Sequence, residues 1–207
     1  MRNGVARYVP AVALLAVLGS GGWIVSQAAD GTGYGAGMMG TGMNGAWLAG
    51  DGKPVEDLQQ ARVRAEEFAA ELDPELSVGE VMEFTENYYA ELENSDGTLA
   101  TEILVDPGTG AVQFEHGPAM MWNEDYGVMA TPSEGKGLTA AEARRRGSNW
   151  AKARGLELGE ADAFPGYYTM HTVRGGEIDG MVSVNASTGR VWLHSWHGEF
   201  LDMEERQ

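Results

Sequence analysis

The sequence predicts an α+β protein, in which one helix packed on a small antiparallel sheet occurs twice after an apolar N-terminal segment. Apolar residues recur three or four positions apart in two stretches, as on one face of a helix. Each stretch is followed by short segments rich in β-forming residues, separated by Gly, Asn and Asp turns. With 207 residues, the chain is long enough to bury an ordinary core.

The N-terminal segment has the layout of an export signal. Arg2 and Arg7 precede an apolar run over residues 8–25, and a bilayer core needs about 20 apolar residues in a helix. The positive flank predicts that the N-terminus lies inside. Residues 1–29 are therefore expected to be a transmembrane anchor, or a signal peptide cleaved after Ala28. Either outcome places the remainder outside the cytoplasm, on the cell membrane or secreted.

Composition excludes several classes of function. The net charge is −17, from 31 acidic and 14 basic residues, which disfavours nucleic acid as a partner. The chain has no cysteine, which excludes a disulfide framework, a thiolate nucleophile and a zinc knuckle. No H-E-x-x-H, G-x-S-x-G or phosphate-binding loop is present, so the sequence predicts a protein that is not an enzyme.

Residues 30–53 are dominated by glycine and are expected to be a linker. Thioethers prefer copper(I) or silver(I), so its methionines form a candidate soft-metal strip. Two alternatives stay open: a slack tether whose composition means little, and an adaptable filler against a sheet or the membrane. The candidate metal ligands are Met38, Met39 and Met43, with Met120 and Met121 as further candidates.

Two helices are expected, one at the start of each copy. Residues 61–69 match 143–151 in the same order as the segments that follow them. The second helix begins at Thr139, where Glu142 three positions later forms a capping box, and ends at Gly155. The apolar stripe of the first helix consists of Val55, Leu58, Ala61, Ala65, Phe68 and Leu72.

Short strands follow each helix. Two turns have matching chemistry, "DPGTG" at 106–110 and "NASTG" at 185–189, where an Asx side chain caps the turn and the last glycine reverses the chain. The strands expected in the first copy are 81–85, 88–93, 101–105 and 111–115.

This order of helix, strands and closing "T-G-x-V" hairpin resembles the PepSY domain, a small secreted module. The resemblance implies a non-enzymatic α+β unit of a kind found in propeptides of secreted metallopeptidases and in anchored extracytoplasmic proteins, thought to bind or restrain peptidases. A "P-x-M-M-W-N" segment at 118–123 is similar to one in small anchored Gly/Met-rich proteins. The residues that carry the match are Asp106, Thr109, Gly110 and Val112, then Asn185, Thr188, Gly189 and Val191.

The expected divisions are 1–29, the leader; 30–53, the linker; 54–118, unit 1; 119–136, a connector; 137–199, unit 2; and 200–207, a charged tail.

The outer faces of the two sheets are expected to differ. If Val112 and Phe114 point inward, Gln113 and Glu115 point outward, so the first sheet is polar outside. The second sheet instead carries an aromatic and methionine stripe, which is either a partner-binding surface or the seam between the units. The seam is favoured because small modules need a shared core. The stripe consists of Trp192, His194 and Trp196, with Met170 and Met181.

The histidines are expected to be structural. His194 and His197 would point to opposite faces of a strand, so a shared ion, with Glu199 beside them, requires the strand to end or bulge between them. His171 is expected to face the helix as a satisfied core residue, and His116 ends a strand.

The sequence thus predicts a membrane-tethered, extracytoplasmic binding module whose partner is a protein or peptide, restraining a peptidase or serving as an accessory subunit. The alternative is a protein that handles copper(I) or silver(I) through its Met-rich segments. No residue supports a hydrolase, and no other cofactor is expected.

Overall fold

The computed structural model describes residues 47–130 and 136–204. The predicted leader and the methionines Met38, Met39 and Met43 lie outside these residues. The described part is α+β with antiparallel sheets, which confirms the predicted class. None of its helices is long and apolar enough to cross a membrane.

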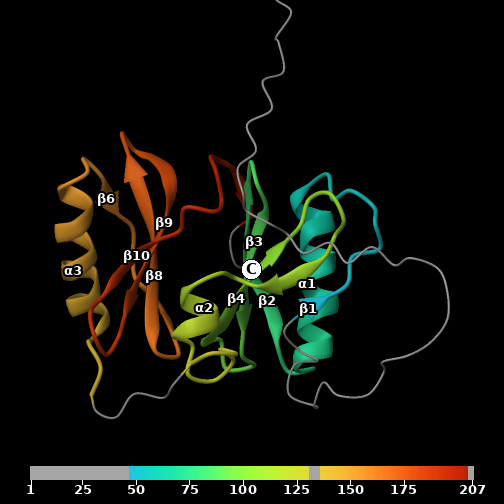
Figure 1. Cartoon of the computed structure of the whole chain (residues 1–207), viewed down its shortest axis with the longest axis horizontal. Coiled ribbons are helices and arrows are strands. Elements are labelled where there is room, and N and C mark those ends of the chain that lie inside the picture. Colours follow the sequence, from blue (N-terminus) through green and yellow to red (C-terminus); the bar gives the residue numbers. More distant parts are fainter. Residues whose placement is uncertain (1–46, 131–135, 205–207) are drawn as a thin grey trace, which may run out of the picture. The chain divides into compact units, whose positions relative to one another are not determined.

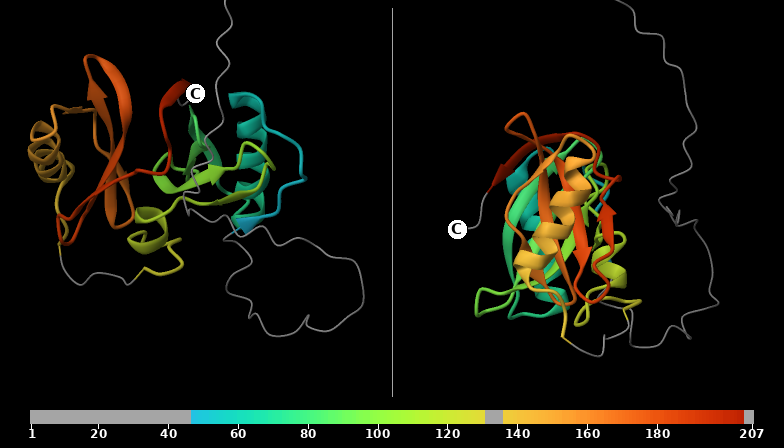
Figure 2. Two further views of the ribbon diagram at one scale, coloured as in Figure 1. Left: turned by 45° about the horizontal axis from the view of Figure 1, so that its top comes forward. Right: turned by 90° about the vertical axis from the view of Figure 1, so that its left-hand side faces the viewer.

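Two sheets face each other, and each carries a helix on its outer side (Figure 1). The six-stranded sheet has the order β1-β5-β4-β3-β2-β11, and the five-stranded sheet has the order β10-β9-β8-β6, with β7 paired to β8. Figure 2 shows α1 and α3 on opposite sides of this pair of sheets. The strands of the first sheet are β1 (Trp47–Leu48), β2 (Ser77–Phe84), β3 (Tyr88–Glu93), β4 (Leu99–Val105), β5 (Val112–Phe114) and β11 (Phe200–Glu204). Those of the second are β6 (Glu157–Leu158), β7 (Asp162–Phe164), β8 (Tyr167–Arg174), β9 (Glu177–Asn185) and β10 (Val191–Leu193). The helices are α1 (Leu58–Leu72), α2 (Pro118–Met121) and α3 (Ala140–Lys152).

Helix α1 begins at the N-cap Asp57, whose carboxylate accepts a hydrogen bond from the Gln60 amide at 2.8 Å. Its predicted stripe is buried against the first sheet, with Phe68 packed edge-on against Phe114 at 5.7 Å between ring centroids. Val55 lies in the same core but precedes the helix. The stripe therefore fixes the inner face of β2 to β5.

Helix α3 has the predicted capping box. The Thr139 hydroxyl accepts from the Glu142 amide at 3.3 Å, and the Glu142 carboxylate accepts from the Thr139 amide at 2.9 Å. The helix approaches its sheet closely at Gly147, where an added Cβ would lie 2.7 Å from the Leu158 side chain. A larger residue there would require the Leu158 side chain to move.

The two predicted turns have the same hydrogen bonds. Asp106 Oδ1 accepts from the Thr109 amide at 2.7 Å, and Asn185 Oδ1 accepts from the Thr188 amide at 2.8 Å. Each turn ends on a glycine with positive φ, a backbone conformation that residues with a side chain rarely adopt. The turns return β5 along β4 and β10 along β9.

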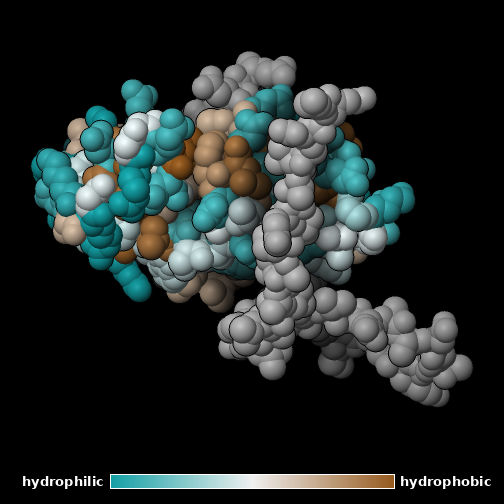
Figure 3. Space-filling model, turned by 90° about the horizontal axis from the view of Figure 1, so that it is seen from above, coloured by the Kyte–Doolittle hydropathy of each residue, from teal (hydrophilic) through white to brown (hydrophobic). Residues whose placement is uncertain are grey.

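The C-terminal segment differs from the charged tail expected from its sequence. After β10 the chain leaves the second sheet, and residues 200–204 form β11, which pairs with β2 of the first sheet. Phe200 and Met203 pack on a core cluster between the sheets, and the Arg62 guanidinium bonds Glu204 at 3.3 Å. Burial of these apolar groups outweighs the charge that suggests a frayed end. On the face drawn in Figure 3, hydrophilic residues surround a smaller group of hydrophobic ones.

Phe68→Ala should lower the free energy of unfolding by about 3–5 kcal/mol, because it opens a cavity under α1. Val63→Ala, on the exposed side of the same helix, should change it by less than about 0.5 kcal/mol. Urea unfolding of the full-length chain, followed by circular dichroism, measures both. A loss below about 1 kcal/mol for Phe68→Ala would contradict the proposed core.

Candidate metal centre

A row of four glutamates crosses the face of the first sheet that meets the second sheet. Glu91 on β3 pairs with Glu102 on β4, and the Glu115 amide donates to the Glu102 carbonyl at 2.9 Å, which places Glu115 beside it. Glu80 on β2 points to the same side. Glu91, Glu102 and Glu115 are at most 2% exposed. Neighbouring like charges are destabilising, so this row requires protons or cations from the second sheet.

His171 meets one end of the row. Its Nε2 lies 3.1 Å from Glu80 Oε1. Burial disfavours the charged imidazole, but the hydrogen bond and charge of Glu80, with the charges of Asp162 and Glu91, raise the pKa of His171 above its usual value. When His171 is protonated, this end of the row is a partly buried ion pair between the sheets.

The faces predicted for two residues of β8 are wrong. His171 faces the first sheet, not the helix. Met170 lies in the core beneath α3, within 3.4 Å of where a Cβ on Gly147 would stand, and not on the outer face. Alternation along β8 links the two corrections, because neighbouring residues point to opposite sides. A shift of one position in the assumed alignment with the first copy reverses both.

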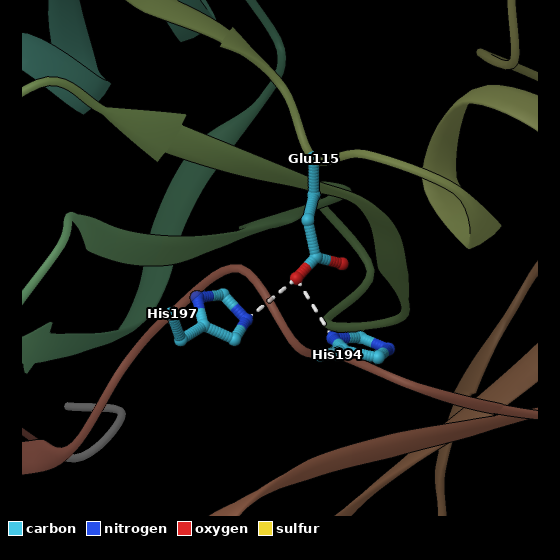
Figure 4. A group of neighbouring side chains, drawn as sticks. All are labelled: Glu115, His194 and His197. Atoms are coloured by element: carbon cyan, nitrogen blue, oxygen red, sulfur yellow. Dashed lines mark hydrogen bonds and ion pairs between the residues drawn. The ribbon is translucent and has the colours of Figure 1, made fainter. Parts of the chain in front are cut away.

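Glu115, His194 and His197 meet at the other end of the row (Figure 4). Glu115 Oε1 lies 2.8 Å from His194 Nδ1 and 2.9 Å from His197 Nε2. All three side chains are at most 1% exposed. Among the described residues, this is the group of histidine and carboxylate side chains that converges closely enough to hold a metal ion.

The strand ends just before the two histidines, so both lie in a loop and the opposite-face constraint of a strand does not apply to them. β10 stops at Leu193, and the loop after it turns His197 back toward Glu115. Gly198 continues this turn with φ 80°, and a Cβ there would collide with the Thr85 hydroxyl. The expectation that the side chains point to opposite faces holds for a strand, not for this loop.

The hydrogen-bond network assigns the tautomer of His197. The Asn87 amide nitrogen donates to the Trp196 carbonyl at 2.9 Å, so its oxygen, 2.8 Å from His197 Nδ1, must be the acceptor. Nδ1 therefore carries a proton, and Nε2 of the neutral ring presents a lone pair. The 2.9 Å contact of Nε2 with Glu115 is not aligned as a hydrogen bond. Either a proton on Nε2 or a metal ion between the two atoms makes this contact favourable.

Two hydroxyl groups orient the His194 ring through its second nitrogen, Nε2. Its Nε2 lies 2.8 Å from Ser183 Oγ, which lies 2.8 Å from Thr169 Oγ1. Metal-binding histidines typically have such a partner on their second nitrogen, because it fixes the ring orientation. Nδ1 is thereby directed at Glu115.

The carboxyls of the row differ in pKa. Burial alone would raise the pKa of Glu115, but the charge and hydrogen bonds of His194, with those of His197, lower it to about 2. Burial lowers the pKa of His197, which its contact with Glu115 partly offsets. Burial, and then the charge of Glu115, raise the pKa of Glu102 well above its usual value. Glu115 therefore loses its proton at a lower pH than Glu102.

The remaining predicted residues lie as follows. Trp196 is half-buried and stacks on His194 at 4.8 Å between centroids, while Trp192 contacts Trp122 edge-on at 5.4 Å. Met181 is buried between the sheets in a cluster of residues from both. Met120 packs against the core under α1, and Met121 is 39% exposed. The stripe residues, except Met170, therefore contact or face the first sheet.

Sequence reasoning missed the third member of the cluster and its supports. Glu115 lies 79 residues from His194 in the chain. One signal was present: the strand segments "YYAELE", "TEILV" and "AVQFE" each place a glutamate on the outward face. Their alignment across three strands only follows from the register.

No family model matches the chain, and neither the curated proteins nor the solved structures include a significant match. The resemblance to the PepSY domain therefore remains a prediction.

His171→Gln should remove a pH-dependent part of the stability. Because the folded-state pKa of His171 is raised, its contribution is fully present below about pH 6.5 and is lost as pH rises through the folded value. The difference in unfolding free energy between wild type and His171→Gln should therefore shrink as the pH rises above about 6.5. Urea unfolding at several pH values measures it. A constant difference would show that folding does not raise the pKa of His171.

Proposed function

We propose that the chain is an extracytoplasmic, non-enzymatic protein that binds a divalent transition-metal ion through Glu115, His194 and His197. The observation that carries the proposal is the convergence of Glu115 Oε1, His194 Nδ1 and His197 Nε2, with both nitrogens within 2.9 Å of the oxygen and all three side chains buried. A metal ion placed among these three atoms would form three bonds. Two imidazoles and one carboxylate are a common ligand set for such ions.

The ligand spacing favours particular ions. With ligand atoms at about 2.0–2.1 Å from the metal, right angles place them about 2.9 Å apart and tetrahedral angles about 3.3 Å. The separations of 2.8 and 2.9 Å match right angles, as in a six-coordinate ion. Nitrogen and carboxylate donors are also harder than thioethers. The cluster therefore suits Mn²⁺, Fe²⁺, Co²⁺ or Ni²⁺ better than copper(I).

Burial argues for holding an ion over using it in catalysis. The three ligands are at most 1% exposed, so a substrate cannot reach an ion between them in this conformation. Glu115 belongs to the first sheet, while both histidines follow the last strand of the second. A bound ion would join the two sheets.

Adding Co²⁺ to the chelator-treated full-length chain should raise its melting temperature, because the ion binds only the folded state. At an ion concentration of about 100 times Kd, the stabilisation is about 2.7 kcal/mol. Glu115→Gln and His197→Gln should each abolish most of this shift.

His116→Gln is the matched control, since His116 neighbours Glu115 in the chain but is not part of the cluster. It should respond to Co²⁺ as wild type does. Circular dichroism checks that each variant is folded. No shift in the wild type with Mn²⁺, Fe²⁺, Co²⁺, Ni²⁺ or Zn²⁺ would end the metal proposal.

A second candidate is the predicted binding of a protein or peptide partner. Three apolar side chains are exposed on α2 and the turn after it: Met121 by 39%, Val128 by 39% and Met129 by 60%. The Met129 amide bonds the Met120 carbonyl at 2.9 Å, which holds this turn against α2. Such a local apolar group favours a contact surface.

A photo-crosslinking residue at Met129 should give one discrete adduct in the native host, whereas the same residue at the exposed Glu177 should give none. The reason is that a specific partner covers one patch and not the whole surface. Adducts are measured by immunoblot and mass spectrometry. Equal crosslinking at both positions would argue against the partner.

Two finer predictions stand beside these. We propose that the two halves are copies of one PepSY-like unit. Two observations support this: the matching turns, and the correspondence between the strand orders β5-β4-β3-β2 and β10-β9-β8-β6. We also propose that residues 1–29 export the chain and that copper(I) or silver(I) binding would use Met38, Met39 and Met43, which lie outside the described residues.

A further inference from the structure

We infer that Glu102 is a fourth ligand, which supplies a second carboxylate to the ion held by Glu115, His194 and His197. This inference rests on the proposed function. It makes the site one of two carboxylates and two imidazoles, suited to a hard or borderline divalent ion.

The position of Glu102 is the first argument. It is the neighbour of Glu115 on the adjacent strand, joined to it by the 2.9 Å hydrogen bond between main-chain groups. Side chains at such neighbouring positions of a sheet stand about 4.5–5.5 Å apart at Cβ and point to the same side. Glu102 therefore extends into the same region between the sheets as Glu115.

The hydrogen bonds of Glu102 leave one oxygen available. Tyr89 donates its hydroxyl to Glu102 Oε1 at 2.8 Å, whereas Oε2 is fully buried with no hydrogen-bond partner. Glu115 Oε2 is in the same condition. Buried acceptors without partners cost free energy, so two of them on neighbouring residues of the sheet indicate a missing positive group. Glu102 lies outside the converging group of Glu115, His194 and His197, so a change of its side-chain rotamer has to bring Oε2 to the ion.

The balance of charge is the second argument. A divalent ion beside Glu115 alone, with two neutral imidazoles, leaves one positive charge in a region sealed from water. Buried charge is costly unless it is paired. The Glu102 carboxylate supplies the second negative charge and makes the bound site neutral.

The rest of the row limits the inference to Glu102. Glu91 is the next residue of the row, equally buried, but it lies one strand further from Glu115. The substitution Glu91→Gln removes one carboxyl group from the row, as Glu102→Gln does. Glu91→Gln is therefore a matched control that separates ligation by Glu102 from the general field of the row.

The experiment is a Co²⁺ titration of the chelator-treated full-length chain, read by visible absorption and by calorimetry. Glu102→Gln should weaken binding by about 10- to 100-fold and should change the absorption bands of the bound ion, because a carboxylate leaves its coordination sphere. Glu91→Gln should change the affinity by no more than about twofold and leave the bands unchanged.

Each outcome decides the inference. Wild-type affinity and an unchanged spectrum in Glu102→Gln overturn it, while Glu115→Gln still tests the proposed function. Equal losses in Glu102→Gln and Glu91→Gln also overturn it, because they indicate long-range charge and not a bond. No Co²⁺ binding by the wild type removes the proposed function and this inference together. Glutamine matches the shape of a protonated glutamate, so both variants should fold, which circular dichroism confirms.

Discussion

Burial of the glutamate row between the two sheets is the constraint on which the rest of this structure depends. Each of these largely buried carboxylates must be met by a proton, a hydrogen-bond donor or a cation. Glu80 meets His171, Glu102 accepts a hydrogen bond from Tyr89, and Glu115 meets His194 and His197. The second sheet is positioned by these contacts as much as by apolar packing, because a shift of either sheet would leave a buried charge unpaired.

The fold could largely be predicted because its signals are local. The capping box at Thr139, the stripe containing Phe68 and the paired Asx turns each lie within a short stretch of chain. The face of each β8 residue could not be predicted as safely. A change of one position in the alignment assigns every side chain of a strand to the opposite face, and this error gave the wrong face for both Met170 and His171.

The site could not be predicted because its members meet only through tertiary structure. Glu115 was placed correctly on the outward face, but nothing in the sequence shows which loop lies opposite it. His194 and His197 share a side only because β10 ends at Leu193 and the loop then runs along the turn between β2 and β3 of the first sheet. The same loop leads into β11, whose pairing with β2 also had no local signal.

This shared loop links the cluster to the attachment of the C-terminus. The main-chain groups of His197 and Glu199 bond those of Glu86 and Thr85, and the His197 ring stacks on Phe84 at 4.4 Å. An apolar cluster of equal volume would often give more stability than buried charges. Stability alone therefore does not account for two histidines and a glutamate at this point. If the proposed ion binds there, it would fix the loop, and the loop leads directly into β11, which covers the edge of β2, so ion binding would be coupled to the attachment of β11.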